Sequence, residues 1–321
     1  MLLEKKILSL VGGKPNKKRT LKLVKWLQKK HLLQAKMRCR RCHHRMKLIL
    51  NANKIDYCEW VCRRQTHRGR STTKSPRSGS LFERSKCTLF NWMKFIYRFA
   101  QGLRLRQIDM LREGITGSSR TLSKMAKTLR RVCRHSMKAY VRRKGQVVGR
   151  HREFVMIDES NFRHKRKYGR GRFAQTWARR KWVFGILGVS QRRRRPILRL
   201  VKRRSRHHLV PLIERHVYPG SQIISDEWRA YRGILTRLGY QHFSVNHSRW
   251  FVDPRTGGHT QNLERAWSTF KGYVWRMRGN RTESMLKEHL FLIEWTYWLG
   301  NRHRDGPLGR LLKDIRHMFH L

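Results

Sequence analysis

The sequence predicts an α/β protein whose second half folds around a mixed β-sheet, preceded by a small metal-binding ribbon and a helical module. Three observations support this prediction. Residues 150–303 alternate between short apolar strands and amphipathic helices. Four of the six cysteines lie within 24 positions of one another. The 77 Lys and Arg residues far outnumber the 19 Asp and Glu residues.

The charge of the chain predicts its class of partner. A formal net charge of +58 attracts nucleic acid. Residues 1–150 carry +35 of this charge and residues 151–321 carry +23, so the first half is expected to be the main binding half. No apolar run reaches the roughly 18 residues of a membrane-spanning helix, and the apolar stretch at the N-terminus is too short for a secretory signal. We therefore expect a folded, soluble protein that binds DNA or RNA.

Residues 1–36 form the first expected segment, a basic helical one. From Thr20 to Lys36 the apolar residues have helical spacing, with Lys on the other face. Residues 37–70 follow as a ribbon, in which MKLIL predicts a strand and NANK a turn.

The ribbon cysteines predict a structural Zn²⁺ site. They read C-x2-C, fifteen residues, then C-x3-C, and zinc requires four nitrogen or sulfur ligands. Cys39 and Cys42 form the first pair. The second is either Cys58 with Cys62 or Cys62 with His67, and the alternative to a zinc site is four free thiols in a small core. His43 and His44 are expected at the surface.

A linker and a helical domain are expected next. Residues 63–80 contain no aliphatic or aromatic side chain, so residues 71–86 are interpreted as a basic linker that becomes ordered on DNA. Residues 87–145 then predict a helix ending at Gly102, a second helix, the turn GITGSS, and a third helix capped by Ser118 or Ser119.

This pattern is typical of a helix-turn-helix, whose last helix enters the major groove. The alternative is a basic three-helix bundle that reads no bases. Cys87 and Cys133 are expected in the core. The predicted DNA-contacting residues of the last helix are Arg120, Lys124, Lys127, Arg130 and Arg131.

The element order of residues 150–303 predicts a ribonuclease H-like fold. Strands are expected at 153–160, 181–190, 196–204, 221–228 and 242–248. Helices are expected at 207–217, 227–239, 260–277 and 284–299. Residues 304–321 are expected to form a C-terminal tail. The order β-β-β-α-β-α-β-α, with one extra helix, is the ribonuclease H-like order.

Three carboxylates lie on elements that are expected to meet at one end of the predicted sheet. Asp158 and Asp226 end the first and fourth strands, and Glu264 lies on the helix after the fifth. In such a sheet these strands are neighbours, so the three acids should converge and hold two Mg²⁺ or Mn²⁺ ions for phosphoryl transfer. The structural alternatives are a strand-end cap, a helix cap, and a pairing of Glu264 with Arg265 or Lys271. Glu159 and Glu227 are second-ranked candidates for metal ligands, because neighbouring residues of a strand point to opposite faces and these two would point away from the aspartates.

The motifs IDESNF, KRKYGRG, WVFGI, PGSQIISDEWRAY and VNHSRWFVDPRTGGHTQNLERAWSTFK resemble those of Merlin-type DNA transposases and of bacterial insertion-sequence transposases. The resemblance is close over residues 150–300 and looser before them. It implies an enzyme of the DDE type that cuts DNA at terminal inverted repeats and joins the 3′ ends to target DNA without a covalent protein–DNA intermediate. Tyr168 and Tyr231 are then packing or DNA-contact residues.

The resemblance implies Asp158, Asp226 and Glu264 as the catalytic triad. Some bacterial relatives have Asn as the third residue, so Asn262 is the alternative to Glu264. Lys271 matches a basic residue two helical turns after Glu264 that contacts phosphate, with a plain salt bridge to Glu264 as the alternative. The ribbon departs from the family pattern, in which a Cys commonly follows the segment that corresponds to WVC.

Two basic runs are candidate DNA clamps, with solvated charge runs as the alternative. Their residues are Arg163, Lys165, Arg166, Lys167, Arg170 and Arg172, and Arg192, Arg193, Arg194 and Arg195.

The expected partners are the transposon ends, target DNA and a second copy of the chain in a dimer or larger synaptic complex. The expected location is the nucleus of a eukaryote, supported by KPNKKR, or otherwise the bacterial cytoplasm. A non-cutting, domesticated DNA-binding protein and a structure-selective nuclease are the alternative functions.

Overall fold

The computed structural model describes residues 2–64, 67, 71–150, 152–162, 182–191, 193–226, 228–245, 261–277 and 282–320. The chain divides into two compact units. The first contains Met1–Ser136 and Arg302–Leu321, and the second contains Met137–Asn301. Within the described residues, no helix combines the length and apolarity that spanning a membrane requires.

The first unit begins with two helices, α1 (Leu2–Val11) and α2 (Lys17–Lys29). Asn16 caps α2, since its side chain accepts a hydrogen bond from the backbone N–H of Arg19 at 2.9 Å. The helix expected over residues 20–36 therefore begins three residues earlier than predicted, at Lys17, and ends earlier than predicted, at Lys29.

A three-stranded antiparallel sheet follows in the order β1 (Lys47–Leu50), β2 (Cys58–Cys62) and β3 (Thr72–Lys74). The third strand lies in the segment that was expected to be a linker. That expectation was wrong: Thr72–Lys74 pairs with β2, and the side chain of Arg77 is buried. Residues 71–80 have no aliphatic or aromatic side chain, and their contacts come from the backbone of β3 and the side chain of Arg77. Leu81 and Phe82, at the end of the predicted linker, are buried in the core.

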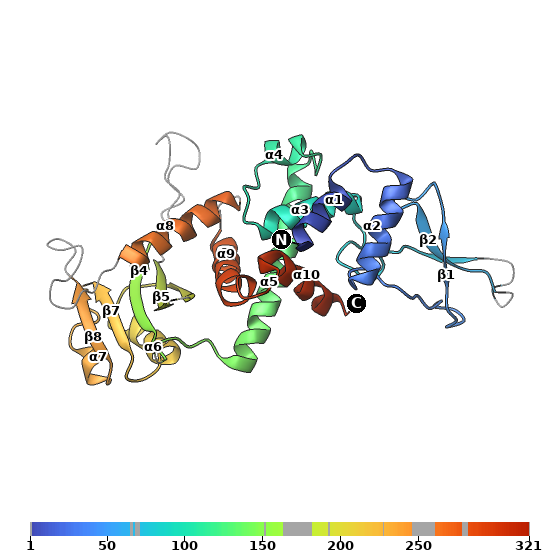
Figure 1. Cartoon of the computed structure of the whole chain (residues 1–321). Coiled ribbons are helices and arrows are strands. Elements are labelled where there is room, and N and C mark those ends of the chain that lie inside the picture. Colours follow the sequence, from blue (N-terminus) through green and yellow to red (C-terminus); the bar gives the residue numbers. More distant parts are fainter. Residues whose placement is uncertain are drawn as a thin grey trace. The chain divides into compact units, whose positions relative to one another are not determined.

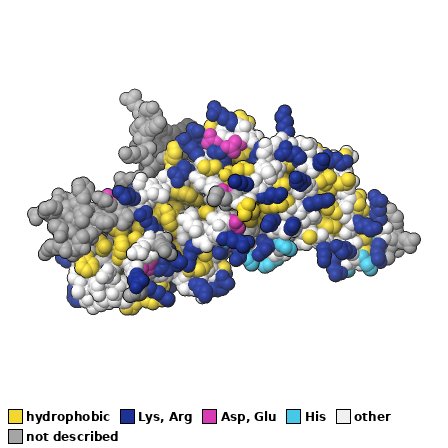
Figure 2. Space-filling view, viewed as in Figure 1, with side chains coloured by type: hydrophobic (Ala, Val, Ile, Leu, Met, Phe, Trp, Pro, Cys, Tyr) yellow, Lys and Arg dark blue, Asp and Glu magenta, His cyan; other side chains and the backbone are white. Residues whose placement is uncertain are grey.

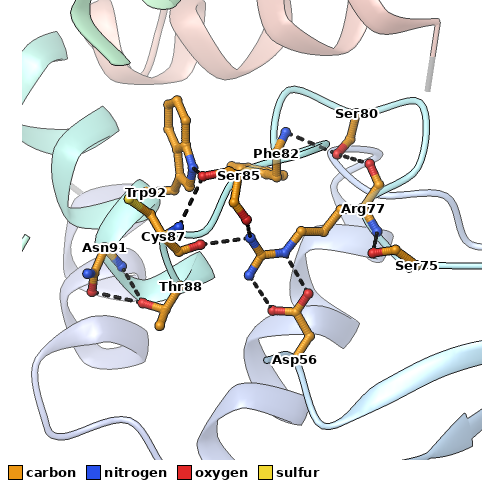
Figure 3. A network of polar contacts seen from close by, with 10 residues as sticks. All are labelled: Asp56, Ser75, Arg77, Ser80, Phe82, Ser85, Cys87, Thr88, Asn91 and Trp92. Atoms are coloured by element: carbon orange, nitrogen blue, oxygen red, sulfur yellow. Dashed lines mark hydrogen bonds and ion pairs between the residues drawn. The ribbon is translucent and has the colours of Figure 1, made fainter. Parts of the chain in front are cut away.

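Arg77 holds this segment against both of its neighbours (Figure 3). Its guanidinium makes a bidentate pair with Asp56, with Nε and Nη2 each 2.6 Å from a carboxylate oxygen. Nη1 also donates to the carbonyl oxygens of Ser85 at 2.9 Å and Cys87 at 2.7 Å. The turn between β1 and β2 is therefore connected to the residues that enter the next helix.

The expected three helices are α3 (Leu89–Ala100), α4 (Gln107–Arg112) and α5 (Ser119–Lys144). Ser118 caps α5, since its Oγ accepts from the N–H of Thr121 at 3.3 Å. Arg98 of α3 donates to the carbonyl of Arg104 at 2.9 Å and also pairs with Glu113, which anchors both ends of the α4 region.

The C-terminal residues form a helix rather than the expected tail. This helix, α10 (Gly306–Phe319), packs against α3 within the first unit. Its buried residues recur at helical spacing and include Leu308, Leu311, Leu312 and Ile315.

The second unit contains the predicted mixed sheet. Its strands are β4 (Phe154–Ser160), β5 (Trp182–Ser190), β6 (Arg193–Val201), β7 (Gln222–Asp226) and β8 (Gln241–Val245). The spatial order is β6-β5-β4-β7-β8. The first three strands form an antiparallel meander, and β7 and β8 run parallel to β4. This arrangement is consistent with a ribonuclease H-like domain.

Helices cover both faces of this sheet (Figure 1). On one face, α8 (Gln261–Arg276) and α9 (Glu283–Trp295) share a core with Met156, Val183 and Leu187, and a π-helical turn at Thr296–Gly300 continues α9. On the other side of the sheet, α6 (Arg206–His216) packs against β5 and β6.

The helix expected over residues 227–239 is reduced to α7 (Ile234–Arg237). Gly233 before this helix and Gly239 after it both adopt positive φ angles, which ends the helical path at each side.

Candidate active site and metal centre

Asp158 and Asp226 lie on neighbouring parallel strands. The pairing of β4 with β7 matches Val155 to Ile223 and Met156 to Ile224, and each aspartate comes two residues after Met156 or Ile224. Parallel strands are about 4.8 Å apart, so the same register places the two aspartates side by side. Met156 and Ile224 both contribute to the core under α8, and alternation puts Asp158 and Asp226 on this same face.

Trp267 of α8 connects the helix to the first of these aspartates. Its indole Nε1 donates to Oδ2 of Asp158 at 2.8 Å. The ring lies directly over Gly185, the β5 residue that pairs with Asp158. A Cβ at position 185 would lie 2.4 Å from Cη2 of Trp267, so only glycine admits the ring there. The residue pattern did not single out Trp267, although its position three residues after Glu264 was a usable signal.

Glu264 lies one turn before Trp267 on the same face of α8, and its side chain is exposed. Lys271 lies one turn after Trp267, with Nζ 5.9 Å from the centroid of the Phe162 ring. Phe162 in turn makes an edge-to-face contact with Trp267. The structure thus places Glu264 and Lys271 on either side of the residue that contacts Asp158. The side chain of Asn262 lies outside the described residues.

The environment of Asp158 opposes its ionisation. Burial raises the pKa of Asp158, and the charge of Asp226 adds to the increase. Hydrogen bonds from Trp267 and from the N–H of Glu159 act in the opposite direction. Two carboxylates side by side at the edge of the sheet form an oxygen donor set that suits a hard divalent cation. The residues present therefore fit Mg²⁺ or Mn²⁺.

Glu159 points to the other face of β4 and is held there by protein contacts. Arg204 Nε donates to its Oε2 at 2.8 Å, and the buried hydroxyl of Tyr231 donates to Oε1. Burial raises the pKa of Glu159 to about 7. These contacts support the lower ranking of Glu159 and give Tyr231 a packing role. Glu227 and Tyr168 lie outside the described residues.

Arg204 also fixes the surroundings of Asp226. Its guanidinium stacks on the rings of Trp182 and Trp228, at 4.5 and 4.2 Å from their centroids. The N–H of Trp228 donates to Oδ1 of Asp226 at 3.2 Å, and its indole Nε1 donates to the carbonyl of Arg204 at 2.9 Å. One chain of contacts therefore runs from Glu159, beside Asp158, to Asp226.

The ribbon gathers Cys39, Cys42, Cys62 and His67, whose ligand atoms all lie within 4.8 Å of one another. Cys42 Sγ is 3.6 Å from Cys62 Sγ, and His67 Nε2 is 3.6 Å from Cys39 Sγ and 3.3 Å from Cys62 Sγ. Ligands of a tetrahedral zinc, at about 2.3 Å for sulfur and 2.0–2.1 Å for nitrogen, lie about 3.5–3.8 Å apart. The residue types and these separations therefore fit a Zn²⁺ site.

Cys58 lies outside this cluster, so the structure favours the pair of Cys62 with His67. Both cysteines belong to the extended strand β2, where four residues span about 13 Å. One zinc ion cannot bind both sulfurs at that separation. Cys58 is instead buried, and desolvation raises its pKa to about 11.

The thiols in the cluster have unequal acidity. A hydrogen bond from the backbone of Cys42 lowers the pKa of Cys39 to about 6, whereas burial raises the pKa of Cys62. His44 and His43 are exposed, as expected.

Helix α5 presents a basic stripe in the first unit. Exposed basic residues recur at intervals of three and four, the spacing of one helix face, and span about 21 Å. They are Arg120, Lys124, Lys127, Arg131 and Arg134, the last of which was not predicted. Figure 2 shows Lys and Arg spread over much of the face in view, with Asp and Glu confined to small spots.

The structure differs from the sequence prediction in the burial of Arg130 and in the secondary structure of the second basic run. Arg130 is only 5% exposed, because it lies on the buried face of α5 with Ala126 and Leu129. Arg193, Arg194 and Arg195 belong to β6 rather than to a turn, and they pair with β5 at the end of the sheet opposite Asp158.

Arg195 is also occupied by the protein, since its guanidinium makes a bidentate contact with Glu153. The remaining predicted contacts lie outside the described residues: Arg163, Lys165, Arg166, Lys167, Arg170, Arg172 and Arg192.

Comparison with protein families matches residues 139–289 to the ISXO2-like transposase domain, a domain of the DDE type. The match covers just under half of the chain and contains Asp158, Asp226 and Glu264. A comparison with curated proteins found no match. The DDE transposase domain implies transposase activity, DNA as a partner and divalent metal ions.

Proposed function

We propose that the chain is a DNA transposase that binds terminal inverted repeats, cleaves the DNA at those ends and joins the 3′ ends to target DNA. The matched domain supports transposase activity. The observation that carries the assignment of the site is the side-by-side placement of Asp158 and Asp226 under α8, with Trp267 connecting the helix to Asp158. Among transposases, the motifs of the chain favour the Merlin type.

In this proposal Asp158, Asp226 and Glu264 hold two Mg²⁺ or Mn²⁺ ions. Such ions would activate the attacking water or DNA 3′-OH and stabilise the leaving oxygen. Trp267 and the N–H of Glu159 orient the carboxylate of Asp158, since each donates to one of its oxygens. Lys271, exposed on the same helix, would contact a phosphate near the scissile bond.

The first unit would select the DNA ends. The ribbon, closed by Zn²⁺ on Cys39, Cys42, Cys62 and His67, and the basic stripe of α5 are the proposed end-binding elements. A dimer or larger synaptic complex is proposed because two ends must be joined together. Nuclear location is proposed for a eukaryotic host.

The test is a strand-transfer assay with linear duplexes that carry the ends of the source element, a plasmid target and Mg²⁺ or Mn²⁺. We expect wild type to form joined products and both Asp158→Asn and Glu264→Gln to lose them. Glu214→Gln is the matched control, because Glu214 is an exposed acid on α6, away from the α8 face.

Other outcomes would change the assignment. Joining by Glu264→Gln would move the third ligand to Asn262. Cutting without joining would indicate a nuclease, and end binding without cutting would indicate a domesticated DNA-binding protein.

A further inference from the structure

A cavity of about 600 Å³ lies in the first unit beside the cysteine–histidine cluster. It is assembled from three segments: the chain before the first cysteine, the residue after the knuckle that contains Cys39 and Cys42, and the last residue of β3. The lining residues are Gln34, Lys36, Met37, Arg38, Arg45 and Lys74. We call this space the ribbon cavity.

The ribbon cavity is lined by cations, and no acidic residue of the lining neutralises them. Four of its six residues are Lys or Arg, and none is acidic. The ion pairs of the surrounding ribbon use other residues, Lys54 with Glu59 and Arg77 with Asp56. The ammonium of Lys74 donates to the thioether of Met37 at 3.6 Å, a weak acceptor.

The backbone holds two of these cations opposite one another. Arg38 and Arg45 form an antiparallel bridge, which places two like charges at directly opposite positions, an unfavourable arrangement in an isolated protein. Arg38 Nη1 donates to the carbonyl of His43 at 3.3 Å, which leaves its positive charge without a counter-charge there. The knuckle enforces the pairing, since Cys39 N–H donates to the carbonyl of His44 at 2.9 Å and Met46 N–H to that of Met37 at 2.8 Å. An anion between the two guanidinium groups would remove the repulsion.

Lys74 joins the pair through the third strand. It lies opposite Trp60 of β2, so the register of β3 determines its position in the cavity. The segment that contains β3 is the one that the sequence had suggested to be a linker. Its folding onto the ribbon is therefore what completes the cationic lining.

We propose that the ribbon cavity binds the phosphodiester backbone of the DNA end, an inference that rests on the proposed function for its choice of DNA as partner. Lys and Arg side chains offer only donors, and Gln34 is the one lining side chain with a strong acceptor. Such a lining suits phosphate oxygens rather than the mixed donors and acceptors of base edges. The cavity positions the ribbon on DNA and leaves sequence reading to other elements.

The experiment measures DNA affinity against salt concentration for the full-length, zinc-loaded chain. Fluorescence anisotropy is recorded with an end duplex and with a scrambled duplex of equal length. The cavity variant is Arg45→Gln with Lys74→Gln. The matched control is Arg41→Gln with Lys47→Gln, which removes the same charge from exposed ribbon residues outside the cavity. Zinc content and circular dichroism establish that both variants are folded.

Each phosphate contact contributes about 0.9 to the slope of log affinity against log salt. We expect the cavity variant to lose about 1–2 units of slope and to weaken binding to both duplexes by a similar factor. The control should retain most of the wild-type slope. Equal losses in both variants, or an unchanged slope in the cavity variant, would overturn the proposal. The proposal would also be overturned if the wild-type cavity binds inorganic phosphate but the cavity variant keeps the wild-type slope for DNA.

The measurement requires no catalysis, which separates two kinds of failure. A wild-type chain that does not bind DNA would reject the proposed function itself. A wild-type chain that binds DNA, with a cavity variant of unchanged slope, would reject only the ribbon cavity as a phosphate site.

Discussion

At the scale of single residues, Trp267 links α8 to the end of β4 through one hydrogen bond and one close packing contact. Its Nε1 donates to Asp158, and its ring occupies the space that Gly185 leaves open. The two contacts can be separated by substitution, because phenylalanine retains the aromatic ring and removes the N–H. The hydrogen bond orients a proposed metal ligand, and such supporting contacts affect metal affinity and activity.

Trp267→Phe is expected to reduce strand transfer or apparent Mg²⁺ affinity by roughly 10–100-fold, the usual effect of losing such a partner. The strand-transfer rate is measured over a Mg²⁺ titration. Trp275→Phe is the control, since Trp275 lies on the same helix and is 54% exposed. DNA-end affinity should remain unchanged in both variants. A wild-type Mg²⁺ profile for Trp267→Phe would show that Asp158 does not depend on this contact.

A second residue-scale difference separates Cys58 from Cys62. Cys58→Ala is expected to retain one zinc ion per chain, because Cys58 lies outside the cluster. Cys62→Ala and His67→Ala are each expected to lose it, since they remove one of four ligands. Zinc per chain is measured after gel filtration with a chromogenic chelator. Loss of zinc from Cys58→Ala with retention in His67→Ala would reverse the assignment.

At the scale of elements, α6 is joined to the segment before the sheet through a buried histidine. The ring of His216 hydrogen-bonds through Nδ1 to the carbonyl of Gln146 at 2.8 Å. Burial lowers the pKa of His216 to about 4, and the charge of Arg199 acts in the same direction. The unfolded chain, with a histidine pKa near 6.5, therefore binds a proton at higher pH than the folded chain does.

The sign of the resulting pH dependence is fixed by this order of pKa values. Between pH 6.5 and pH 4 the unfolded state holds more protons, so His216 reduces stability as the pH falls, by up to about 3 kcal/mol. His216→Asn keeps a donor for Gln146 without the titration. Urea unfolding between pH 7 and pH 5 should show a smaller loss in this variant than in wild type. If the unfolding free energies of wild type and His216→Asn change with pH in parallel, His216 is not the source of the pH dependence.

At the scale of the whole molecule, the first unit depends on a buried ion pair that connects two of its parts. Arg77 and Asp56 have side chains 4% and 2% exposed, and Arg77 also contacts Ser85 and Cys87 ahead of α3. The pair thus ties the ribbon to the helical part of the unit. Removing one partner of such a pair leaves the other charge buried, which costs about 3–5 kcal/mol.

Arg77→Met is expected to lower amide protection in residues 47–62 and 75–92, while the second unit, Met137–Asn301, keeps its protection. Hydrogen exchange measured by mass spectrometry would resolve these segments. The double variant Asp56→Asn with Arg77→Met should recover part of the loss, because no charge is then left buried. Lys86→Met, a substitution of an exposed cation nearby, is the control. If both units lost amide protection equally, the Arg77–Asp56 pair would not stabilise the first unit alone.

Local pattern accounts for the parts of this structure that the sequence predicted well. Strands β4 to β8 were predicted from runs of apolar and alternating residues, and Ser118 was one of two predicted caps of α5. Arg130 shows the limit of such reasoning. It belongs to a basic run, and only the packing of α5 places it on the buried face while Arg131 next to it is exposed.

The sequence by itself determined the order of the strands in the five-stranded sheet and the placement of Asp158 and Asp226 on the first and fourth of them, because the periods of strands and helices are encoded by neighbouring residues. It also determined the cationic character of the chain. Only the tertiary structure decided that His67 rather than Cys58 joins the cysteine cluster, that Trp267 contacts Asp158, and that Lys74 completes the ribbon cavity. These contacts join residues far apart in the chain. They depend on strand register and side-chain packing, which no local period specifies.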